Sequence, residues 1–405
     1  MSEPARRPPA TLVYRLPGLG AVYANGFELD AWWDDHRTRL EHDEPAAPSE
    51  KRARMSRPAV ARGAVAVATL GLAFGLVVWT YQRRPASRPV DPGVREAYLK
   101  GRLFLESPTE EQTRKAIDSF EQAVRDDPGH APAYAGLARA RLASANLLVP
   151  TRDAIAPAQA AARKAISLDA SSAEAYTAQG LLRAALDWDP RAAERDLRHA
   201  VQIDPSDARA HLYLGIALIL QGRNEEGVTA LERARQLDPV SLKINARLGM
   251  IYAFVGRREQ GLAQCHKALE LDKNSPEGHM CVGFVLERGG AYREAASAYE
   301  KASELGYRAA PHAARVLALS GQVVEARRRL RALEEGRRRG QAWSPYDLAK
   351  VSHALGDEEG AFAWLEVAYN ERDETLVALR VEPEWDNLRS NPRFVAIARK
   401  TGVMP

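Results

Sequence analysis

Few residues of this 405-residue chain have side chains that could carry covalent or metal chemistry. Its only cysteines are Cys265 and Cys281, and the histidines near them are His266 and His279. Two cysteines cannot make a disulfide framework, and with only two histidines nearby they are a poor match to a zinc site. Two alternatives stay open for the cysteines: two buried apolar side chains, which we favour, or one disulfide between neighbouring helices.

Motifs typical of enzymes are missing from the sequence. It has no phosphate-binding glycine loop with the required Lys, no His-Glu-x-x-His and no Gly-x-Ser-x-Gly. Its carboxylates pair with Arg and Lys at helical spacing, as on solvated helix faces. The arginine cluster of residues 327–339 has the same interpretation, and a net charge of +4 is too small to indicate nucleic-acid binding. We therefore expect no enzyme, and no cofactor, metal, small-molecule substrate or nucleic acid.

A spacing of 34 residues organises the middle of the chain. Three columns of small residues share it: Gly215, Gly249 and Gly283; Gly222, Gly256 and Gly290; Ala234, Ala268 and Ala302. Such a register indicates one supersecondary unit that is stacked on itself. A stack of this kind is a binding surface, and not a reaction centre, unless catalytic residues accompany it.

Each unit is predicted to be a pair of helices. In residues 208–241, Leu214 and Leu218 recur at helical spacing and give an apolar stripe. Gly222 ends this first helix because glycine accepts the positive φ found just past a helix end. Pro239 ends the second helix because proline disfavours helical backbone in the residue before it. Small residues on both helices let the two approach closely.

The pattern resembles the tetratricopeptide-repeat family. The matching residues of three central repeats are Leu214-Gly215, Gly227, Leu231, Ala234 and Pro239; Leu248-Gly249, Tyr252, Gly261, Cys265 and Ala268; and Val282-Gly283, Ala295, Tyr299 and Ala302. Weaker matches extend the resemblance over residues 94–370. It implies an all-α fold, an α-solenoid that forms a right-handed superhelix of about seven to eight helix pairs.

Residues 371–405 are expected to form a capping segment, which solenoids require at an exposed end. The side chains that would cover the last repeat are Trp385, Leu388, Phe394 and Ile397. The segment is also similar to the ends of bacterial regulators, in which one membrane helix joins tetratricopeptide repeats to a winged-helix, kinase or cyclase domain. Residues 1–58 cannot hold a domain of that size, so the output function of those regulators is not carried over.

One segment departs from the composition of the repeats. Residues 63–81 carry no charge and would span roughly 28 Å as a helix, close to the thickness of a bilayer's hydrocarbon core. Trp79 and Tyr81 fall where an interfacial aromatic belt belongs. We therefore predict a transmembrane helix within residues 59–82, followed by a linker over residues 83–93.

The flanks of this predicted helix bear on its topology. Positive charges on its two sides are too similar in number to decide the orientation. The charged tail of residues 1–58, which we expect to be largely disordered, has no export signal of its own. We therefore expect the N-terminus inside and the repeats on the periplasmic side of a bacterial inner membrane. Gly71 and Gly75 form a Gly-x-x-x-Gly motif, so a homodimer through them is an alternative.

In the tetratricopeptide-repeat family, the first helices of the pairs line a concave groove. By register, the resemblance places eight residues of this chain there: Arg209, Leu212, Ile216, Lys243, Ala246, Met250, Met280 and Phe284. Such a groove is apolar with basic edges and suits an extended or helical apolar peptide. The family's clamp for C-terminal carboxylates is not expected, because apolar residues replace most of its polar ones. Each of the eight residues has a place in the core between repeats as its alternative.

The sequence therefore predicts a membrane-anchored tetratricopeptide-repeat scaffold that binds a protein or peptide partner in its concave groove. Two other functions stay open. The chain could be a sensory or regulatory membrane protein that signals through its short N-terminal tail. It could also be an accessory factor in envelope assembly or secretion.

Overall fold

The computed structural model describes residues 12–14, 22–24, 90–106, 109–145, 148–149 and 151–402 of the chain. The chain divides into two units, Met1–Ser87 and Arg88–Pro405. In the first unit, strands β1 (Leu12–Tyr14) and β2 (Val22–Ala24) pair antiparallel, with Val13 opposite Tyr23. The sequence analysis did not predict these two strands.

The predicted membrane helix of residues 59–82, with Gly71 and Gly75, lies outside the described residues. Within the described part of the chain, no helix is long and apolar enough to cross a bilayer. The membrane helix, its topology and the homodimer therefore stay predictions.

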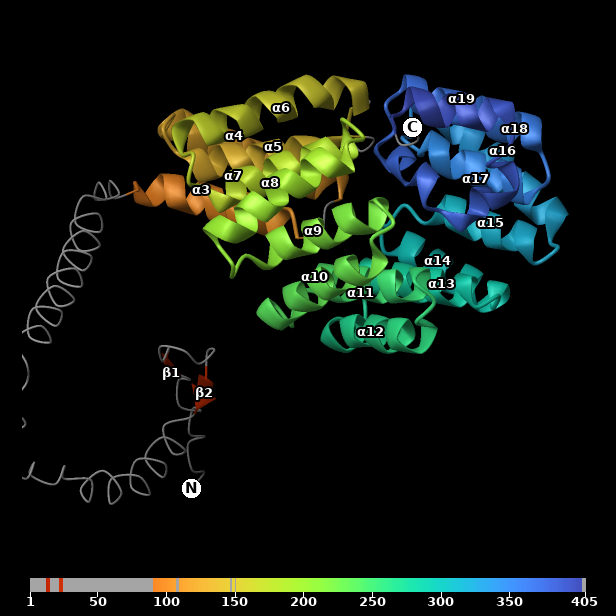
Figure 1. Ribbon diagram of the computed structural model, residues 1–405, viewed down its shortest axis with the longest axis horizontal. Coiled ribbons are helices and arrows are strands. Elements are labelled where there is room, and N and C mark those ends of the chain that lie inside the picture. The colour runs from red at the N-terminus through yellow and green to blue at the C-terminus, as the bar shows by residue number, and fades with distance from the viewer. Residues whose placement is uncertain are drawn as a thin grey trace, which may run out of the picture. The chain divides into compact units, whose positions relative to one another are not determined.

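The second unit is a solenoid of helix pairs that follow one another along an arc (Figure 1). The eight pairs of its described residues are α3 (Pro92–Phe104) and α4 (Glu110–Asp126), α5 (Ala131–Ser144) and α6 (Thr151–Leu168), α7 (Ala173–Ala185) and α8 (Pro190–Ile203), α9 (Ala208–Leu220) and α10 (Asn224–Leu237), α11 (Leu242–Phe254) and α12 (Arg258–Leu271), α13 (Pro276–Arg288) and α14 (Tyr292–Glu304), α15 (Ala310–Leu319) and α16 (Val323–Arg338), and α17 (Pro345–Ala354) and α18 (Glu358–Asn370). Two 3-10 helices, η1 (Glu374–Arg380) and η2 (Pro383–Leu388), and helix α19 (Pro392–Lys400) complete the unit. The helical-repeat solenoid expected from the 34-residue register is confirmed.

Local sequence sets the ends of the helices. Ser241 and Ser275 cap α11 and α13, because each hydroxyl accepts a hydrogen bond from a backbone N–H of the first turn. Gly222 and Gly256 follow α9 and α11 with φ angles of +79° and +87°. This left-handed backbone costs other residues roughly 1–2 kcal/mol, so the predicted role of this glycine column is confirmed.

A second glycine column lets the two helices of a pair pack closely. A Cβ atom added at Gly215 would lie 2.7 Å from Cγ of Leu231. One added at Gly283 would lie 2.6 Å from the ring of Tyr299. Both distances are well below van der Waals contact, so a larger residue would push the helices apart.

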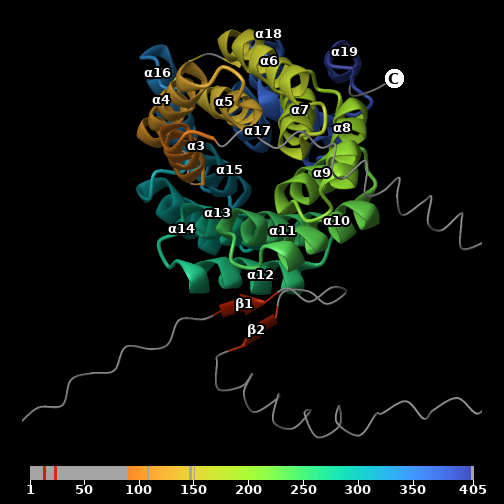
Figure 2. The same ribbon diagram turned by 90° about the vertical axis from the view of Figure 1, so that its left-hand side faces the viewer.

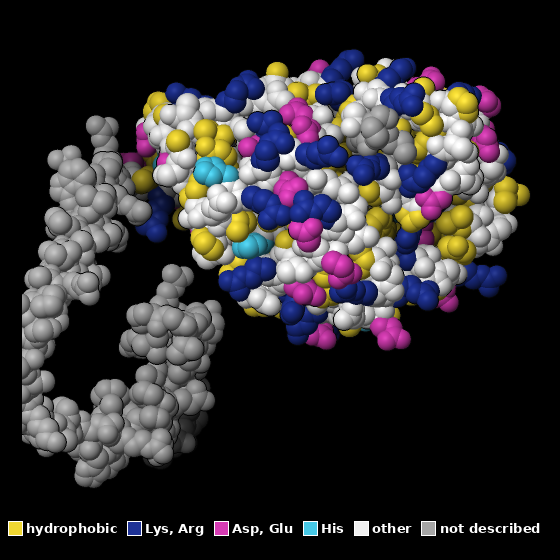
Figure 3. Space-filling model, in the orientation of Figure 1, with side chains coloured by type: hydrophobic (Ala, Val, Ile, Leu, Met, Phe, Trp, Pro, Cys, Tyr) yellow, Lys and Arg dark blue, Asp and Glu magenta, His cyan; other side chains and the backbone are white. Residues whose placement is uncertain are grey.

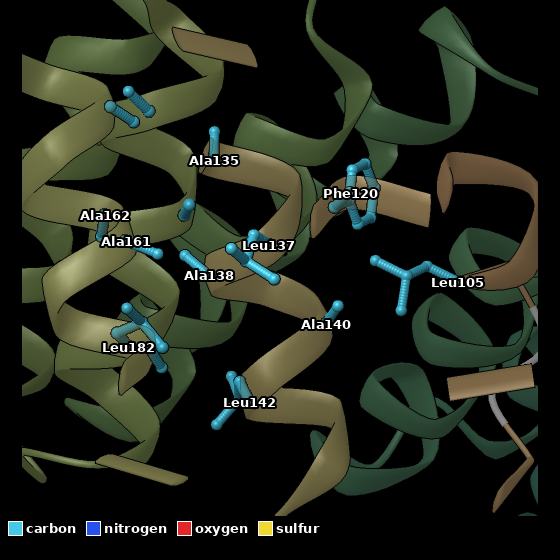
Figure 4. Close-up of a cluster of buried hydrophobic side chains, with 14 of the residues drawn as sticks. Leu105, Phe120, Ala135, Leu137, Ala138, Ala140, Leu142, Ala161, Ala162 and Leu182 are labelled. Atoms are coloured by element: carbon cyan, nitrogen blue, oxygen red, sulfur yellow. The ribbon is translucent and has the colours of Figure 1, made fainter. Parts of the chain in front are cut away.

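The hydrophobic core runs along the arc as clusters between the helices. The cluster of the first repeats combines a few large side chains, such as Phe120, Leu137 and Leu182, with many alanines (Figure 4). Because alanine is small, the helix backbones of these repeats approach closely and form a continuous, tightly packed layer.

The C-terminal segment covers the last repeat. Trp385, Phe394 and Ile397 are buried in one cluster with Tyr346 of α17 and Phe362 of α18. The Trp385 Nε1–H donates a hydrogen bond to the hydroxyl of Tyr346 at 2.9 Å, which satisfies its one polar group. This segment therefore closes the hydrophobic core at that end of the solenoid.

Charged side chains of the same segment form ion pairs with the first helices of the last three pairs. The Glu384 carboxylate lies 3.3 Å from both Arg288 of α13 and Arg315 of α15. The Tyr346 hydroxyl donates to Glu382 at 2.6 Å, and Lys350 of α17 lies 3.6 Å from the same carboxylate. The capping segment thus occupies the exposed side of α13, α15 and α17.

The two cysteines form a disulfide between α12 and α13, and both are fully buried. Of the two open alternatives, the structure therefore has the disulfide, although we favoured free side chains. His266 is exposed on α12, and a ring nitrogen of His279 lies 3.1 Å from the carbonyl oxygen of Lys273. In residues 90–402, as far as they are described, no group of three or more metal-binding side chains comes together.

Candidate partner-binding surface

The first helix of each pair lies toward the inside of the arc and the second helix toward the outside (Figure 2). First helices of successive pairs also pack directly on each other, as α5 does on α7 and α7 on α9. We call the surface that the first helices form the inner face. The capping segment forms ion pairs with α13, α15 and α17, and its helix η1 packs against α7 and α9. The candidate binding surface is what remains of the inner face on α5, α7, α9 and α11.

The residues predicted to line the groove have two different environments. Leu212, Ala246 and Met280 are only 2–4% exposed and pack among the helices of neighbouring repeats. These three are core residues, because their face of the first helix meets the next pair. The other five predicted residues are half-buried: Arg209, Ile216, Lys243, Met250 and Phe284.

Basic side chains of three first helices surround one tyrosine on the inner face. We call Arg139 of α5, Arg209 and Tyr213 of α9, and Lys243 and Arg247 of α11 the inner basic surface. Burial alone would raise the pKa of Tyr213, but the four cations together lower it below its usual value. A lowered phenol pKa at this half-buried position indicates a concentrated positive potential.

Two carboxylates, Glu174 and Asp207, serve the two arginines of this surface, and Asp207 Oδ1 lies 3.9 Å from Arg209 Nε. Arg209 Nη2 donates to Glu174 Oε1 at 3.3 Å, and Arg139 Nη1 lies 3.7 Å from the same oxygen. The Tyr98 hydroxyl donates to Glu174 Oε2 at 2.6 Å, and burial together with this carboxylate raises the pKa of Tyr98. Glu174 and Asp207 therefore balance the guanidinium charges of Arg139 and Arg209 between them.

Two donors of these arginines have no hydrogen-bond acceptor among the described residues. They are Nη1 of Arg139 and Nη1 of Arg209, and both atoms are buried. Arg139 as a whole is only 7% exposed. Both atoms are closed to solvent in this structure, and Arg139 Nη1 has the Glu174 carboxylate as its ion-pair partner at 3.7 Å.

The side of the solenoid seen in Figure 3 carries charges of both signs, with Lys and Arg side chains interspersed among those of Asp and Glu. The arginine cluster of α16 follows this pattern: Arg328 pairs with Glu325 at 2.6 Å, and Arg329 with Glu300 at 2.7 Å. Exposed pairs of this kind are typical of solvated helices and contribute little to binding or stability.

An acidic residue of the C-terminal segment also reaches the inner face. Helix η1 packs against α7 and α9, and Glu374 is its first residue. Burial, together with the charge of Asp373, raises the pKa of Glu374 to about 7, while Arg247 and Arg308 act in the opposite direction. Arg247 and Arg308 therefore offset only part of the effect of burial on Glu374.

The sequence analysis found Arg209 and Lys243 but missed the other charged residues of this site. Glu174 carries a usable signal, because it precedes Arg209 by 35 residues and occupies the same place at the start of its helix. Tyr213 and Arg247 are likewise 34 residues apart. Arg139 has no such signal, since the longer second repeat shifts its register.

Comparison with known proteins agrees with the architecture. A tetratricopeptide-repeat family model matches residues 187–239, which contain the three helices α8, α9 and α10. The chain contains tetratricopeptide repeats. No significant match to a curated protein sequence is found.

Solved tetratricopeptide-repeat structures resemble parts of this repeat protein. A thermophilic TPR protein of Thermus thermophilus is 21% identical, with a TM-score of 0.41, and the match covers 48% of this chain and 99% of that one. PilF of Pseudomonas aeruginosa is 19% identical, with a TM-score of 0.38 and coverage of 65% and 98%. YrrB, described as a TPR protein with an unusual peptide-binding site, is 21% identical, with a TM-score of 0.31 and coverage of 47% and 93%.

Proposed function

We propose that this tetratricopeptide-repeat protein is a membrane-anchored scaffold that holds an acidic segment of a partner protein on its inner basic surface. The observation that supports the proposal is the gathering of Arg139, Arg209, Lys243 and Arg247 on three first helices, with Arg247 exposed and Arg209 and Lys243 half-buried. Carboxylates are the natural ligands of such guanidinium groups, because charge-assisted hydrogen bonds to them are strong and directional.

A peptide segment fits this surface better than a small anion does. The cations are spread over α5, α9 and α11, so several carboxylates are needed to meet them all. The half-buried Ile216 and Met250 belong to α9 and α11 and would receive apolar side chains of the same segment. The proposal keeps the predicted apolar groove with basic edges and adds acidic residues to the partner.

The binding test uses a fluorescein-labelled hexaglutamate peptide and the detergent-solubilised full chain. Lys243→Glu should weaken peptide binding roughly tenfold, because it replaces an attraction by a repulsion at the site. Lys267→Glu is the matched control, since Lys267 lies on the second helix α12 and pairs only with Glu270 there. Equal binding by both variants and the unchanged chain would refute the proposed surface.

The membrane anchor and the location are part of the same proposal. Residues 63–81 support the anchor through their length and lack of charge. The Cys265–Cys281 disulfide supports a location outside the cytoplasm, because disulfides persist in oxidising compartments. With a tag after Pro405, protease should digest the solenoid in spheroplasts. Protection until lysis would place it in the cytoplasm and overturn this part.

The alternative functions differ in whether they need the N-terminal tail of residues 1–58. A sensor that signals through residues 1–58 loses its output when the tail is deleted, although it still captures its partner. A scaffold, or an accessory factor in envelope assembly or secretion, keeps its function as long as the anchor and inner face are intact. Complementation of a null strain by a chain lacking residues 2–58 distinguishes them.

A further inference from the structure

Among the described residues, the first helix of the solenoid keeps one row of apolar side chains uncovered. Leu99 and Leu103 of α3 lie one helical turn apart and are 48% and 68% exposed. Val90, just before the helix, is also exposed, and the three side chains line one shallow hollow. We call these three residues the α3 stripe. Apolar side chains that gather in one exposed patch indicate an interaction surface, whereas singly scattered ones do not.

The opposite face of α3 already supplies the packing that the first repeat needs. Val94 and Gly101 are buried on that face, and Tyr98 packs against the core of the first repeats. These residues recur at helical spacing and form the core-facing row of an amphipathic helix. Leu99 and Leu103 therefore have no place in the core of the solenoid.

The repeat architecture buries the equivalent face of the next first helix. Gly101 and Gly136 set the register between α3 and α5, because both lie against the ring of Phe120. In this register the residue equivalent to Leu103 is Ala138, which is fully buried. Helix α5 packs against α4 of the preceding pair, whereas α3 is the first helix of the described solenoid (Figure 1). Terminal repeats ordinarily have a polar outer face, so the leucines of α3 indicate that this face meets another surface.

Positive charge is concentrated around the α3 stripe. Residues 83–103 contain six Lys and Arg residues and two Asp and Glu residues, so their net charge is +4, equal to that of the whole chain. Arg95 and Lys100 line the same hollow as the stripe, and Lys100 pairs with Glu96 at 2.7 Å. Apolar side chains flanked by Lys and Arg are the pattern of a helix that lies in the interface of an anionic bilayer.

The length of the chain limits how far the α3 stripe can be from the predicted membrane helix. Seven residues, 83–89, separate the predicted helix within residues 59–82 from Val90. A segment of this length spans at most about 25–30 Å when it is fully extended. Val90 belongs to the stripe, so the chain enters α3 on the apolar side. A bilayer that holds the predicted helix is therefore within reach of the stripe.

We propose that the α3 stripe docks on the surface of an anionic bilayer. This inference rests on the membrane anchor of the proposed function and adds a second membrane contact to it. Leu99 and Leu103 enter the boundary between the headgroups and the acyl chains, while Arg95 and Lys100 meet the phosphate groups of the lipids. The two contacts together orient the solenoid, with its first repeat on the membrane.

The test probes the surroundings of α3 in the full chain, reconstituted into nanodiscs. Leu99→Cys is labelled with the environment-sensitive fluorophore NBD, and Val324→Cys, at an exposed site on α16, is the matched control. The native cysteines stay unlabelled because they form a buried disulfide. In phosphatidylglycerol, lipids with a nitroxide on the acyl chain should quench the label at position 99 roughly twofold and leave that at position 324 unchanged.

A second substitution separates docking from mere closeness to the membrane. Leu103→Asp, added to the labelled Leu99→Cys chain, should remove most of the quenching, because its carboxylate is repelled by anionic headgroups. Leu103 is exposed, so circular dichroism should show an unchanged helix content. Phosphatidylcholine in place of phosphatidylglycerol should also weaken the quenching. Quenching that persists in Leu103→Asp would contradict docking through the α3 stripe.

The other outcomes overturn the proposal in distinguishable ways. A label that is shielded from water but not quenched by the nitroxide lipids means that protein covers the stripe, either residues 1–62 or a second copy of the chain. A water-exposed label in a chain embedded in the nanodisc refutes the docking and leaves the anchor standing. A chain that does not enter nanodiscs refutes both, while hexaglutamate binding still tests the inner basic surface.

Discussion

The guanidinium of Arg372 lies over the ring of Trp188, and both residues have a left-handed backbone. One follows the third first helix, α7, and the other follows the last second helix, α18. The contact therefore joins two distant repeats of one solenoid. It does so at positions where a helix end would ordinarily carry glycine, as Gly222 and Gly256 do.

Backbone strain at Arg372 predicts different stabilities for two small replacements. Arg372→Ala and Arg372→Gly both remove the contact with Trp188, but only glycine relieves the positive φ. We expect the glycine variant to be more stable by about 1 kcal/mol in urea unfolding. Equal stability of the two variants would show that this residue is not held in the left-handed region.

The two glycine columns should respond differently to alanine. The Cβ added by Gly290→Ala would have no atom within 4 Å, so the only cost comes from the φ of +79°, which alanine disfavours. This variant should lose about 1 kcal/mol of stability. Gly283→Ala brings a Cβ to 2.6 Å from the Tyr299 ring and should cost about 1–3 kcal/mol through overpacking.

A smaller partner side chain checks this distinction. Tyr299→Leu should recover part of the stability lost in Gly283→Ala and none of that lost in Gly290→Ala. Urea unfolding of the three single variants and the two double variants gives the coupling energies. A coupling of zero between positions 283 and 299 would contradict the packing role of this glycine column.

The raised pKa of Glu374 predicts a pH-dependent stability. Its value of about 7 in the folded chain lies above the usual value of 4.5, so the folded chain holds a proton that the unfolded chain has released. The free energy of unfolding should therefore fall as pH rises from about 4.5 through about 7. Glu374→Gln should be more stable than the unchanged chain by about 2 kcal/mol at pH 8, with no such difference below pH 4.

Urea unfolding across this pH range measures the difference in stability between Glu374→Gln and the unchanged chain. Other carboxylates, including Asp373, are present in both, so their titration largely cancels. Glu366→Gln, at an exposed site on α18, is the control and should show no pH-dependent difference. A constant difference between Glu374→Gln and the unchanged chain at all pH values would rule out the raised pKa.

The Cys265–Cys281 disulfide should stabilise the central repeats. It closes a loop of 16 residues in sequence separation, for which about 3 kcal/mol is expected. Replacing both cysteines by alanine keeps both sites apolar and should lower the free energy of unfolding by this amount. A reducing agent should lower the free energy of unfolding of the unchanged chain to a similar value. Two reactive thiols in the denatured, unreduced chain would show instead that the cysteines are free.

Much of this fold could be predicted from residue types at a fixed spacing. Gly222 and Gly215 each have a physical reason to be glycine, one in its backbone angle and the other in its packing. Because such reasons recur in the central repeats, at Gly249 and Gly283 and at Gly256 and Gly290, they leave a periodic signal in the sequence.

The binding surface was harder to predict than the fold. A residue such as Leu212 recurs at the right spacing whether it faces a partner or the next repeat, so periodicity alone cannot place it. The Trp188–Arg372 contact depends on the curvature of the arc. That curvature is the sum of small angles between many successive helix pairs, which the sequence pattern does not give. Trp188 itself left a signal, since it breaks the glycine column 34 residues before Gly222.

The charge preference of the inner face tests the central claim most directly. Binding of labelled hexaglutamate and hexalysine should be compared for the unchanged chain and for a variant with Arg209→Glu and Lys243→Glu. We predict that the unchanged chain prefers hexaglutamate and that the variant prefers hexalysine, while circular dichroism shows the same helix content. A preference that stays the same in the variant would contradict a partner site on the inner basic surface.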